Sequence, residues 1–574
     1  MSGASRWHQI LRRGAQAALG TALLVLLAAV VLEASWTAKL LAVLLYALLA
    51  LPLFLLTGRP RFSLLLAALP LDTIFLASKV KQHFLDAPLL FFDAQYLTGR
   101  HLFDLAVVYV PLTLGILAAL TLMAALLALV WRMDRRRPHA LWPWLLASLL
   151  PLPLALVYQR LAGHGVEEVA DPWQILSAHD RVFESFFVSA LHREPRLWPV
   201  AEQAVPPAAP AAPAPAEPTP PVALPELFTI LQESTFDPNR LLRYCAKQPC
   251  VDREFTQPPV SGAMKVHTFG GGTWMSEFSY LVGLPHLSLG PAGYYAPHTM
   301  MGRVRHSLPQ YLKGLGYATI AIYPTEGEFI NASAFYRSIG FDEFLDLGDL
   351  GLGGGQYPWR IPDQALFDGV LKQLPVIRAR HPGKPLFVFL LTLAQHGPHG
   401  PGFIPKDALP DPRVPAAYPA FTRLALSDYL RRMDKSAVAF ARLRKALQAA
   451  APRERRSLVL HWGDHHPEFS NRLPAADFTV TEAADYTTYY ALHGVAQDGL
   501  DARLPRQRLD IAYLSTLLLK AAGLPLDEVF QLRERAWREC GGRYAGCEQP
   551  VIGELHRLLL DRQHLDVQAL HADR

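Results

Sequence analysis

The stretch SLVLHWGDHH, residues 457–466, decides the fold, because it joins a short apolar run to a group of polar side chains. The first six residues have the length and composition of a buried strand. Similar runs occur at LFTIL (227–231), ATIAIY (318–323) and LFVFLLTL (386–393), with helical patterns over 302–315, 363–380 and 426–450. Alternating strands and helices predict an α/β domain with a mainly parallel sheet flanked by helices.

Polar side chains follow three of these predicted strands. Glu233 comes after the first strand, His396 and His399 follow the run 386–393, and Asp464 and His465 follow the run 457–462. Each residue alone could be a turn, cap or loop residue. In open α/β sheets, however, ligands bind outside the carboxyl ends of the strands. Carboxylate oxygen and imidazole nitrogen are metal ligands, so the sequence predicts a metal site at this edge.

A glycine run precedes a predicted helix in HTFGGGTWMSEFSYL, residues 267–281. It could be a loop with positive φ that ends in an ordinary Thr cap. The metal ligands at the sheet edge favour a second interpretation. Thr273 would then lie at a helix N-terminus, which favours anions, and a hydroxyl beside a metal loses its proton more easily. Thr273 is therefore the predicted nucleophile toward a phosphate diester.

The apolar residues are concentrated before residue 160. The chain is 51% hydrophobic and 18% charged, and long apolar runs cover 15–35, 38–56, 62–78, 103–131 and 141–158. A membrane-spanning helix needs about 20 such residues. A cleaved signal peptide would explain only the first run. We therefore predict a five-helix transmembrane domain over residues 1–160.

Basic residues predict the orientation of these helices. One side would have only Lys79, Lys81 and Arg100. The other side has nine arginines, namely Arg6, Arg12, Arg13, Arg59, Arg61, Arg132, Arg135, Arg136 and Arg137. The positive-inside rule places that side, and the N-terminus, in the cytoplasm. Five spans then place the rest of the chain outside. The modest net charge of +5, without basic stripes, argues against nucleic acid as a partner.

Composition also divides the remainder of the chain. We expect a membrane-proximal helical segment over 161–203, a Pro/Ala-rich linker over 204–225 and a catalytic domain over 226–574. The four cysteines form two close pairs, Cys245 with Cys250 and Cys540 with Cys547. In an exported domain such pairs predict two local disulfides. Zinc binding is the alternative, although these spacings are not typical of zinc fingers.

Four motifs together resemble the sulfatase-like branch of the alkaline phosphatase superfamily, and most closely membrane-bound lipoteichoic acid synthase and phosphoglycerol transferase proteins. They are Glu233-Ser234, Gly272-Thr273, His396-Gly397-Pro398 and Gly463-Asp464-His465. The resemblance covers nearly the whole chain. It implies one divalent metal ion, Mn²⁺ or Zn²⁺, held by Glu233, Thr273, Asp464 and His465. It also implies that Thr273 is the nucleophile, that His396 binds substrate or protonates the leaving group, and that Trp359, Arg360 and His399 contact the substrate.

The implied function is that of a metal-dependent phosphotransferase in the bacterial inner membrane, with its catalytic domain in the periplasm. It would move phosphoglycerol from phosphatidylglycerol to a glycan or lipid-linked sugar through a phosphothreonine intermediate. Phosphoethanolamine transfer from phosphatidylethanolamine, a phosphodiesterase or sulfatase-like hydrolase, and a non-catalytic scaffold in glycan assembly are the alternatives. Sulfate-ester hydrolysis is disfavoured, because the chain lacks the C/S-x-P-x-R motif that matures into formylglycine.

Overall fold

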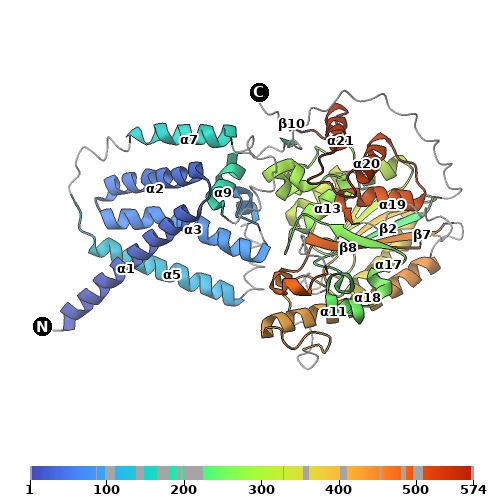
Figure 1. Ribbon diagram of the computed structural model, residues 1–574, viewed down its shortest axis with the longest axis horizontal. Helices are drawn as coiled ribbons and strands as arrows, with labels where there is room; N and C mark the ends of the chain where they lie inside the picture. Colours follow the sequence, from blue (N-terminus) through green and yellow to red (C-terminus); the bar gives the residue numbers. More distant parts are fainter. Residues whose placement is uncertain are drawn as a thin grey trace. The chain divides into compact units, whose positions relative to one another are not determined.

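The computed structural model describes most of the chain in two compact units, Met1–Arg193 and Glu194–Arg574 (Figure 1). The described residues are 3–85, 87–96, 110–137, 148–164, 180–191, 196–197, 224–327, 329–352, 361–400, 410–450, 455–479, 486–494 and 508–569. The predicted linker lies almost wholly outside these ranges, so its conformation stays a prediction.

The N-terminal unit contains one helix for each predicted apolar run. These helices are α1 (Gly3–Leu32), α2 (Trp36–Thr57), α3 (Pro60–Leu85), α5 (Val110–Met133) and α7 (Pro151–His164), and the unit also contains η1 (Phe91–Tyr96) and α9 (Val182–Leu191). Among the described residues, three helices are long and apolar enough to cross a membrane: α2, α3 over Pro60–His83 and α5 over Thr113–Met133. The apolar part of α1, Leu19–Leu32, is shorter. These three helices support the predicted transmembrane domain, whereas the count of five spans stays a prediction.

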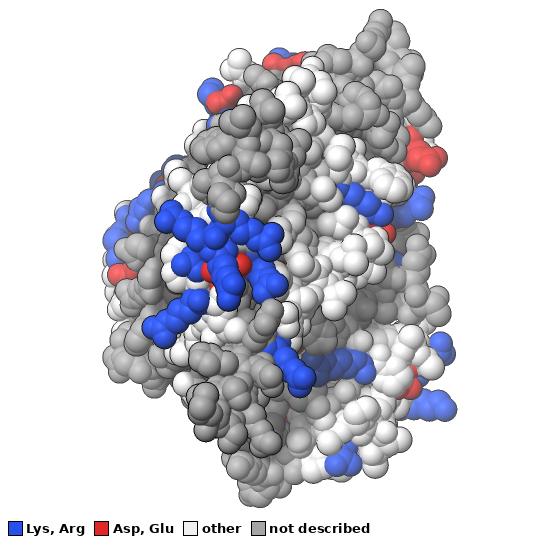
Figure 2. All heavy atoms as spheres, turned by 90° about the vertical axis from the view of Figure 1, so that its left-hand side faces the viewer, with Lys and Arg blue, Asp and Glu red and all other residues white. Residues whose placement is uncertain are grey.

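Two predicted cytoplasmic loops meet at one end of this helical unit. The guanidinium of Arg59, which follows α2, bonds to the backbone oxygens of Trp131 and Asp134. The backbone N–H of Arg137 donates to the carbonyl of Gly58 at 2.8 Å. Figure 2 looks onto this end of the helices and shows basic side chains gathered around a small acidic spot. The fold thus brings the arginines that follow α2 and those that follow α5 to one end of the unit.

The second unit is built on an eight-stranded sheet with the order β5-β4-β6-β2-β7-β8-β3-β9. Its strands are β2 (Glu226–Gln232), β3 (Val260–Lys265), β4 (Ala318–Ile322), β5 (Glu343–Leu345), β6 (Leu386–Thr392), β7 (Ser457–Gly463), β8 (Thr487–His493) and β9 (Leu509–Asp510). A separate two-stranded sheet pairs β1 (Arg196–Leu197) with β10 (Gln568–Ala569). The four predicted strands are confirmed as β2, β4, β6 and β7.

The central strands run parallel to one another, and β8 is the exception. Strand β2 pairs in parallel with both β6 and β7, whereas β8 pairs antiparallel with β7 and β3. The sheet is therefore mixed, although its site-bearing half is parallel. The central strands β2, β4 and β6 are buried along their whole length. This explains their continuous apolar runs, because helices cover both faces of a parallel sheet.

Helices cover both faces of this sheet. The helices of this unit are α10 (Pro238–Leu241), α11 (Arg243–Lys247), α12 (Arg253–Thr256), α13 (Thr273–Val282), η2 (His286–Tyr295), α14 (Ala296–Thr299), α15 (Leu308–Gly314), η3 (Phe329–Asn331), α16 (Ala332–Ser338), α17 (Asp363–Arg380), α18 (Ala420–Ala450), η6 (Glu468–Arg472), η7 (Ala475–Asp477), η10 (Ile511–Tyr513), α19 (Leu514–Ala522), α20 (Glu528–Glu539) and α21 (Pro550–Asp561). Helices α17 and α18 bury their apolar faces in one core with Phe228 and Ile230 of β2. Helix α13 packs on the other face, where the Tyr280 hydroxyl lies 2.9 Å from that of Thr229.

Helix boundaries differ from the sequence predictions at two places. The helix predicted over 302–315 begins only at Leu308, because the Ser307 hydroxyl accepts the Gln310 N–H and caps it. The helix predicted over 426–450 begins earlier, at Ala420. The helix predicted over 363–380 has those bounds.

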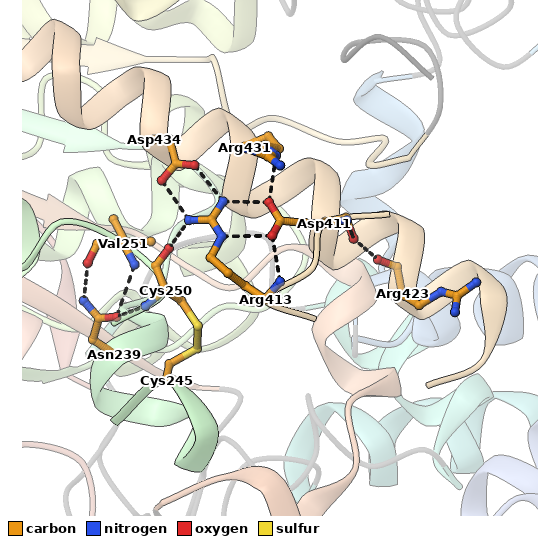
Figure 3. Close-up of polar contacts among 10 residues, drawn as sticks. Asn239, Cys245, Cys250, Val251, Asp411, Arg413, Arg423, Arg431 and Asp434 are labelled. Atoms are coloured by element: carbon orange, nitrogen blue, oxygen red, sulfur yellow. Dashed lines mark hydrogen bonds and ion pairs between the residues drawn. A yellow bond between two sulfur atoms is a disulfide. The ribbon is translucent and has the colours of Figure 1, made fainter. Parts of the chain in front are cut away.

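Both predicted disulfides are present, Cys245–Cys250 and Cys540–Cys547. A network of charges holds the first of these loops (Figure 3). Arg413 bonds to the carbonyl oxygen of Cys250 and to both oxygens of Asp411 and Asp434. On the other side of the loop, the side-chain oxygen of Asn239 accepts the Cys250 N–H at 2.7 Å. The 245–250 loop is thus fixed to α18.

Replacing Arg413 with alanine is expected to lower the apparent unfolding temperature of the full-length protein by several degrees. The Asp411 side chain is fully buried and would keep only its ion pair with Arg431, and loss of the charged hydrogen bonds from Arg413 costs about 2 kcal/mol. Thermal unfolding followed by tryptophan fluorescence would measure the shift. Arg538→Ala is the matched control, because Arg538 is exposed and has no ion pair within the described ranges. Equal shifts in the two variants would contradict the assignment of a stabilising role to this network.

Candidate active site

Glu233, Thr273, Asp464 and His465 meet at the carboxyl edge of the parallel strands. The Thr273 Oγ1 lies 3.3 Å from His465 Nε2. That nitrogen is 3.2 Å from Asp464 Oδ2 and 3.7 Å from Glu233 Oε1. The two carboxylates and the imidazole are buried, whereas Thr273 is half-buried. Four side chains separated by up to 232 positions along the chain therefore face one small volume.

Strand register brings the two carboxylates together. Gln232, the last residue of β2, pairs with Gly463, the last residue of β7, so Glu233 and Asp464 leave the sheet side by side. A Cβ on Gly463 would lie 2.1 Å from the carbonyl oxygen of Thr235, so only glycine fits between the two strand ends. Ser234 adopts a positive φ of 54°, a strained conformation for a residue with a side chain. Its N–H donates to Asp464 Oδ1 at 2.8 Å.

The glycine run positions Thr273. Gly270 and Gly272 have φ values of 68° and 77°, so the predicted need for positive φ is confirmed. The Gly270 N–H donates to the carbonyl of His466 at 3.0 Å, which ties this loop to the one that bears Asp464 and His465. Thr273 is the first residue of α13. One turn on, the Ser276 hydroxyl donates to the carbonyl of Asp464 at 2.8 Å.

The atoms that face the centre are hydrogen-bond acceptors. His465 Nδ1 lies 2.8 Å from the carbonyl oxygen of His466, which can only accept, so Nδ1 carries the proton. The Nε2 lone pair then points toward the carboxylates. Glu233 Oε2 and Asp464 Oδ2 accept no hydrogen bond from the described residues. Burial, with the Asp464 carboxylate beside it, raises the pKa of Glu233 to about 8.

This donor set fits a divalent cation. Ligand atoms of Glu233, Asp464 and His465 lie within 4.8 Å of one another, and this is the one such group among the described parts of the chain. Two buried carboxylates without nearby positive charge cost free energy, which a bound cation would recover. The backbone carbonyl behind His465 holds the ring in the tautomer that a metal requires. Oxygen and imidazole ligands suit several divalent metals.

His396 lies beside the metal-ligand group, on its solvent-exposed side. Its Nε2 is 4.0 Å from Glu233 Oε1, and about a third of its side chain is exposed. Burial lowers its pKa, and its Nδ1 is 2.7 Å from the carbonyl of Gly397. A residue that the sequence did not indicate, Arg432 of α18, donates to the carbonyls of His396 and Pro398. Arg432 is itself paired with Asp428, so α18 fixes the loop.

Three further residues are predicted to contact the substrate: Trp359, Arg360 and His399. Trp359 and Arg360 lie outside the described residues, so their roles stay predictions. His399 is 5% exposed and packs against the rings of Tyr429 and Phe469. Neither of its ring nitrogens has a hydrogen-bond partner in the described structure. Its predicted contact with substrate is untested, and its surroundings are those of a core histidine.

Helix α13 also bears a buried acid that was not predicted from the sequence, Glu277. Glu277 lies four residues after Thr273 and is 1% exposed. Its carboxylate accepts a hydrogen bond from the Tyr336 hydroxyl of α16. Burial raises the pKa of Glu277 to about 8, and Asp464 adds to the effect. The available signal was a glutamate four residues after Thr273, as the single charged residue of α13.

Comparison with known families identifies this region. Residues 252–496 match the sulfatase family model. We call this segment the sulfatase domain, after the family model that it matches. The match confirms the predicted resemblance to the sulfatase-like branch of the alkaline phosphatase superfamily. The sulfatase domain, as matched, includes Thr273, His396, Asp464 and His465, whereas Glu233 precedes it.

Curated relatives match part of the chain. An uncharacterised protein of Haemophilus influenzae is 26% identical over 326 residues, which are 53% of this chain and 55% of that protein. A putative cyclic β-1,2-glucan modification protein of Rhizobium meliloti is 26% identical over 250 residues, 42% of this chain and 36% of that protein. The chain thus spans about half or less of the length of these relatives.

A solved structure is similar to part of this chain. It is the phosphoglycerol transferase GacH of Streptococcus pyogenes in complex with sn-glycerol-1-phosphate, with a TM-score of 0.43 and 16% sequence identity. The match covers 59% of this chain and 85% of that chain.

Proposed function

We propose that this protein is a metal-dependent phosphotransferase that moves a phospholipid head group to a sugar hydroxyl. The observation that supports this most directly is the convergence of the Thr273 hydroxyl with two buried carboxylates and a lone-pair nitrogen. Glu233, Thr273, Asp464 and His465 would hold one divalent ion, Mn²⁺ or Zn²⁺. When bound, that ion would lower the pKa of the Thr273 hydroxyl and offset charge on the phosphoryl oxygens.

The proposed reaction is a double displacement at phosphorus. Thr273 Oγ1 forms a bond to the head-group phosphorus of phosphatidylglycerol, and the bond from phosphorus to the diacylglycerol oxygen breaks. A phosphothreonine ester remains. An acceptor hydroxyl then attacks the same phosphorus, and the bond to Thr273 Oγ1 breaks. The position of Thr273 at the N-terminus of α13 favours the negative charge of the phosphate in both steps.

His396 is the proposed proton carrier. Its lowered pKa keeps the ring neutral near pH 7, so its Nε2 can take the proton that Thr273 loses. It then gives this proton to the oxygen of the departing diacylglycerol. In the second step the acceptor's proton returns to Thr273 by the same nitrogen, so protons balance over the cycle. Arg432 keeps the ring in place through the backbone of the 396–398 loop.

The proposed location is the bacterial inner membrane, with the sulfatase domain in the periplasm. A diacyl donor cannot leave the bilayer at low cost, so a membrane-tethered enzyme meets it in place. The arginines at one end of the helical unit support a cytoplasmic N-terminus. Two disulfides in the sulfatase-containing unit support an oxidising compartment.

The acceptor we propose is a glucan or a lipid-linked sugar. The name of the Rhizobium meliloti relative refers to modification of cyclic β-1,2-glucan, which supports a glucose polymer as the first acceptor to test. Phosphatidylethanolamine is the alternative donor. The proposed site binds the phosphate, which both lipids share, and none of its assigned residues contacts the rest of the head group, where the two lipids differ.

Transfer from labelled lipids tests this proposal. The full-length protein would be reconstituted in vesicles that contain phosphatidylglycerol or phosphatidylethanolamine with a labelled head group, and a β-1,2-linked glucose oligosaccharide would be added with Mn²⁺ or Zn²⁺. We expect diacylglycerol release and an oligosaccharide heavier by one phosphoglycerol unit, measured by mass spectrometry. Transfer from phosphatidylethanolamine but not from phosphatidylglycerol would identify phosphatidylethanolamine as the donor. Free glycerol phosphate without a sugar product would indicate a hydrolase, and metal binding without turnover would favour a scaffold.

A further inference from the structure

A cavity of about 490 Å³ lies at the same edge of the sheet as the candidate active site. It is lined by residues from the end of β5 and from the start of α16, among them Ser333, Arg337, Phe344, Asp346 and Asp349. None of these residues belongs to the four motifs or to the proposed mechanism.

Sheet order places the cavity at the edge of the sheet that also bears the reaction centre. Strands β5, β4, β6 and β2 are consecutive and parallel, so the residues after β5 and those after β2 leave the sheet at one edge. Three strand spacings separate β5 from β2, which is about 14 Å. Helix α16 is also tied to the nucleophile helix, because Tyr336 donates to Glu277, four residues after Thr273. An oligosaccharide of a few sugar units is long enough to extend from the cavity to Thr273.

The residues that line the cavity offer hydrogen-bond donors and acceptors that could bind neutral hydroxyl groups. Arg337 is exposed and makes no side-chain hydrogen bond or ion pair with any described residue. Asp346 and Asp349 each use one carboxylate oxygen to accept N–H groups of their own turn, at 2.8 and 3.0 Å. Their other oxygens have no described protein partner. One guanidinium and two carboxylates leave a formal charge of −1, which disfavours a phosphate.

The packing around the cavity holds part of its wall in an unusual backbone conformation. Ile330 and Asn331 both have positive φ values, 46° and 60°, and a β-branched residue rarely adopts this conformation. A Cβ on Gly327 would lie 3.1 Å from the Ser333 Cβ and 3.2 Å from the Phe344 ring, so the wall is closely packed here. Strain of this kind persists where the surrounding structure holds it, as it does at Ser234 beside the metal ligands.

We infer that this cavity binds a neutral sugar unit of the acceptor glycan, so that a neighbouring sugar hydroxyl reaches the phosphothreonine. Phe344, which lines the cavity, offers apolar contact for a sugar ring. Arg337, Ser333 and the two carboxylates offer donors and acceptors for its hydroxyls. This assignment rests on the proposed function, because it names the class of molecule that the second displacement uses.

Two variants test the assignment: Arg337→Ala removes donors, and Ala334→Trp fills the cavity from α16. In the vesicle assay we expect each to raise the KM for the β-1,2-linked glucose oligosaccharide about tenfold, the effect of losing a charged hydrogen bond. Diacylglycerol release without acceptor should not change. Arg538→Ala and Ala449→Trp are matched controls at exposed positions outside the cavity. Unchanged acceptor KM in both cavity variants would overturn the inference.

Direct binding separates this inference from the proposed function. Saturation-transfer NMR would measure binding of the same oligosaccharide to the full-length protein in the absence of any lipid donor. We expect binding by the wild type and both controls, and weaker binding by the two cavity variants. If the wild type releases no diacylglycerol but this pattern is found, the proposed reaction fails and the sugar site stands. If the wild type transfers the head group and the cavity variants bind sugar normally, the sugar site fails alone.

Discussion

Replacing Thr273 with alanine is expected to reduce head-group transfer at least about 10⁴-fold, as removal of a nucleophile does in other enzymes. The substitution removes the only hydroxyl that lies 3.3 Å from His465 Nε2 within the described site. Diacylglycerol release from phosphatidylglycerol vesicles would measure the rate. Intact-protein mass spectrometry after brief exposure to the lipid should show one added phosphoglycerol on the wild type and none on the variant.

Thr273→Ser is the control for this prediction. Serine keeps the hydroxyl at the first position of α13, so measurable transfer and a labelled protein are expected. Met275, Ser276 and the buried face of α13 are unaffected by either change, and both variants should unfold at the wild-type temperature. Transfer by Thr273→Ala at a rate near that of the wild type would remove residue 273 from the mechanism.

The Asp464→Asn substitution is expected to abolish metal binding and activity without loss of the fold. Asparagine retains the oxygen that accepts the N–H groups of Ser234 and His465, both at 2.8 Å. It removes the charge that, after burial, is the main reason for the raised pKa of Glu233. The metal-free variant should therefore unfold at a temperature equal to or above that of the metal-free wild type. Added Mn²⁺ or Zn²⁺ should stabilise the wild type and should not stabilise the Asp464→Asn variant.

Metal content by mass spectrometry and unfolding temperature with and without metal would be measured together. Asp561→Asn is the control, because Asp561 is an exposed carboxylate with no ion pair among the described residues. An Asp464→Asn protein that binds one equivalent of metal as tightly as the wild type would show that the cation lies elsewhere. A metal-free variant much less stable than the metal-free wild type would contradict the account of repulsion between Glu233 and Asp464.

Much of the architecture was predictable, because each element had a local cause. The apolar runs of β2, β4, β6 and β7 are continuous since both faces of the parallel sheet are covered. The other four strands of the sheet, β3, β5, β8 and β9, were not predicted. Strand β8, TTYYALH, begins with two threonines and lacks a continuous aliphatic run. It is nevertheless buried, because its antiparallel partners β7 and β3 lie on both sides.

The sequence alone determined which residues could act. Strand ends followed by carboxylate and imidazole, and a glycine run before Thr273, are local patterns whose chemistry depends on residue type. Tertiary structure decided their use. Strand register set Glu233 beside Asp464, and the His466 carbonyl chose the tautomer of His465. Burial placed His399 among aromatic rings, and the packing of α16 against β5 formed the cavity. These outcomes depend on distances between segments far apart in the chain, which arise only when the sheet assembles.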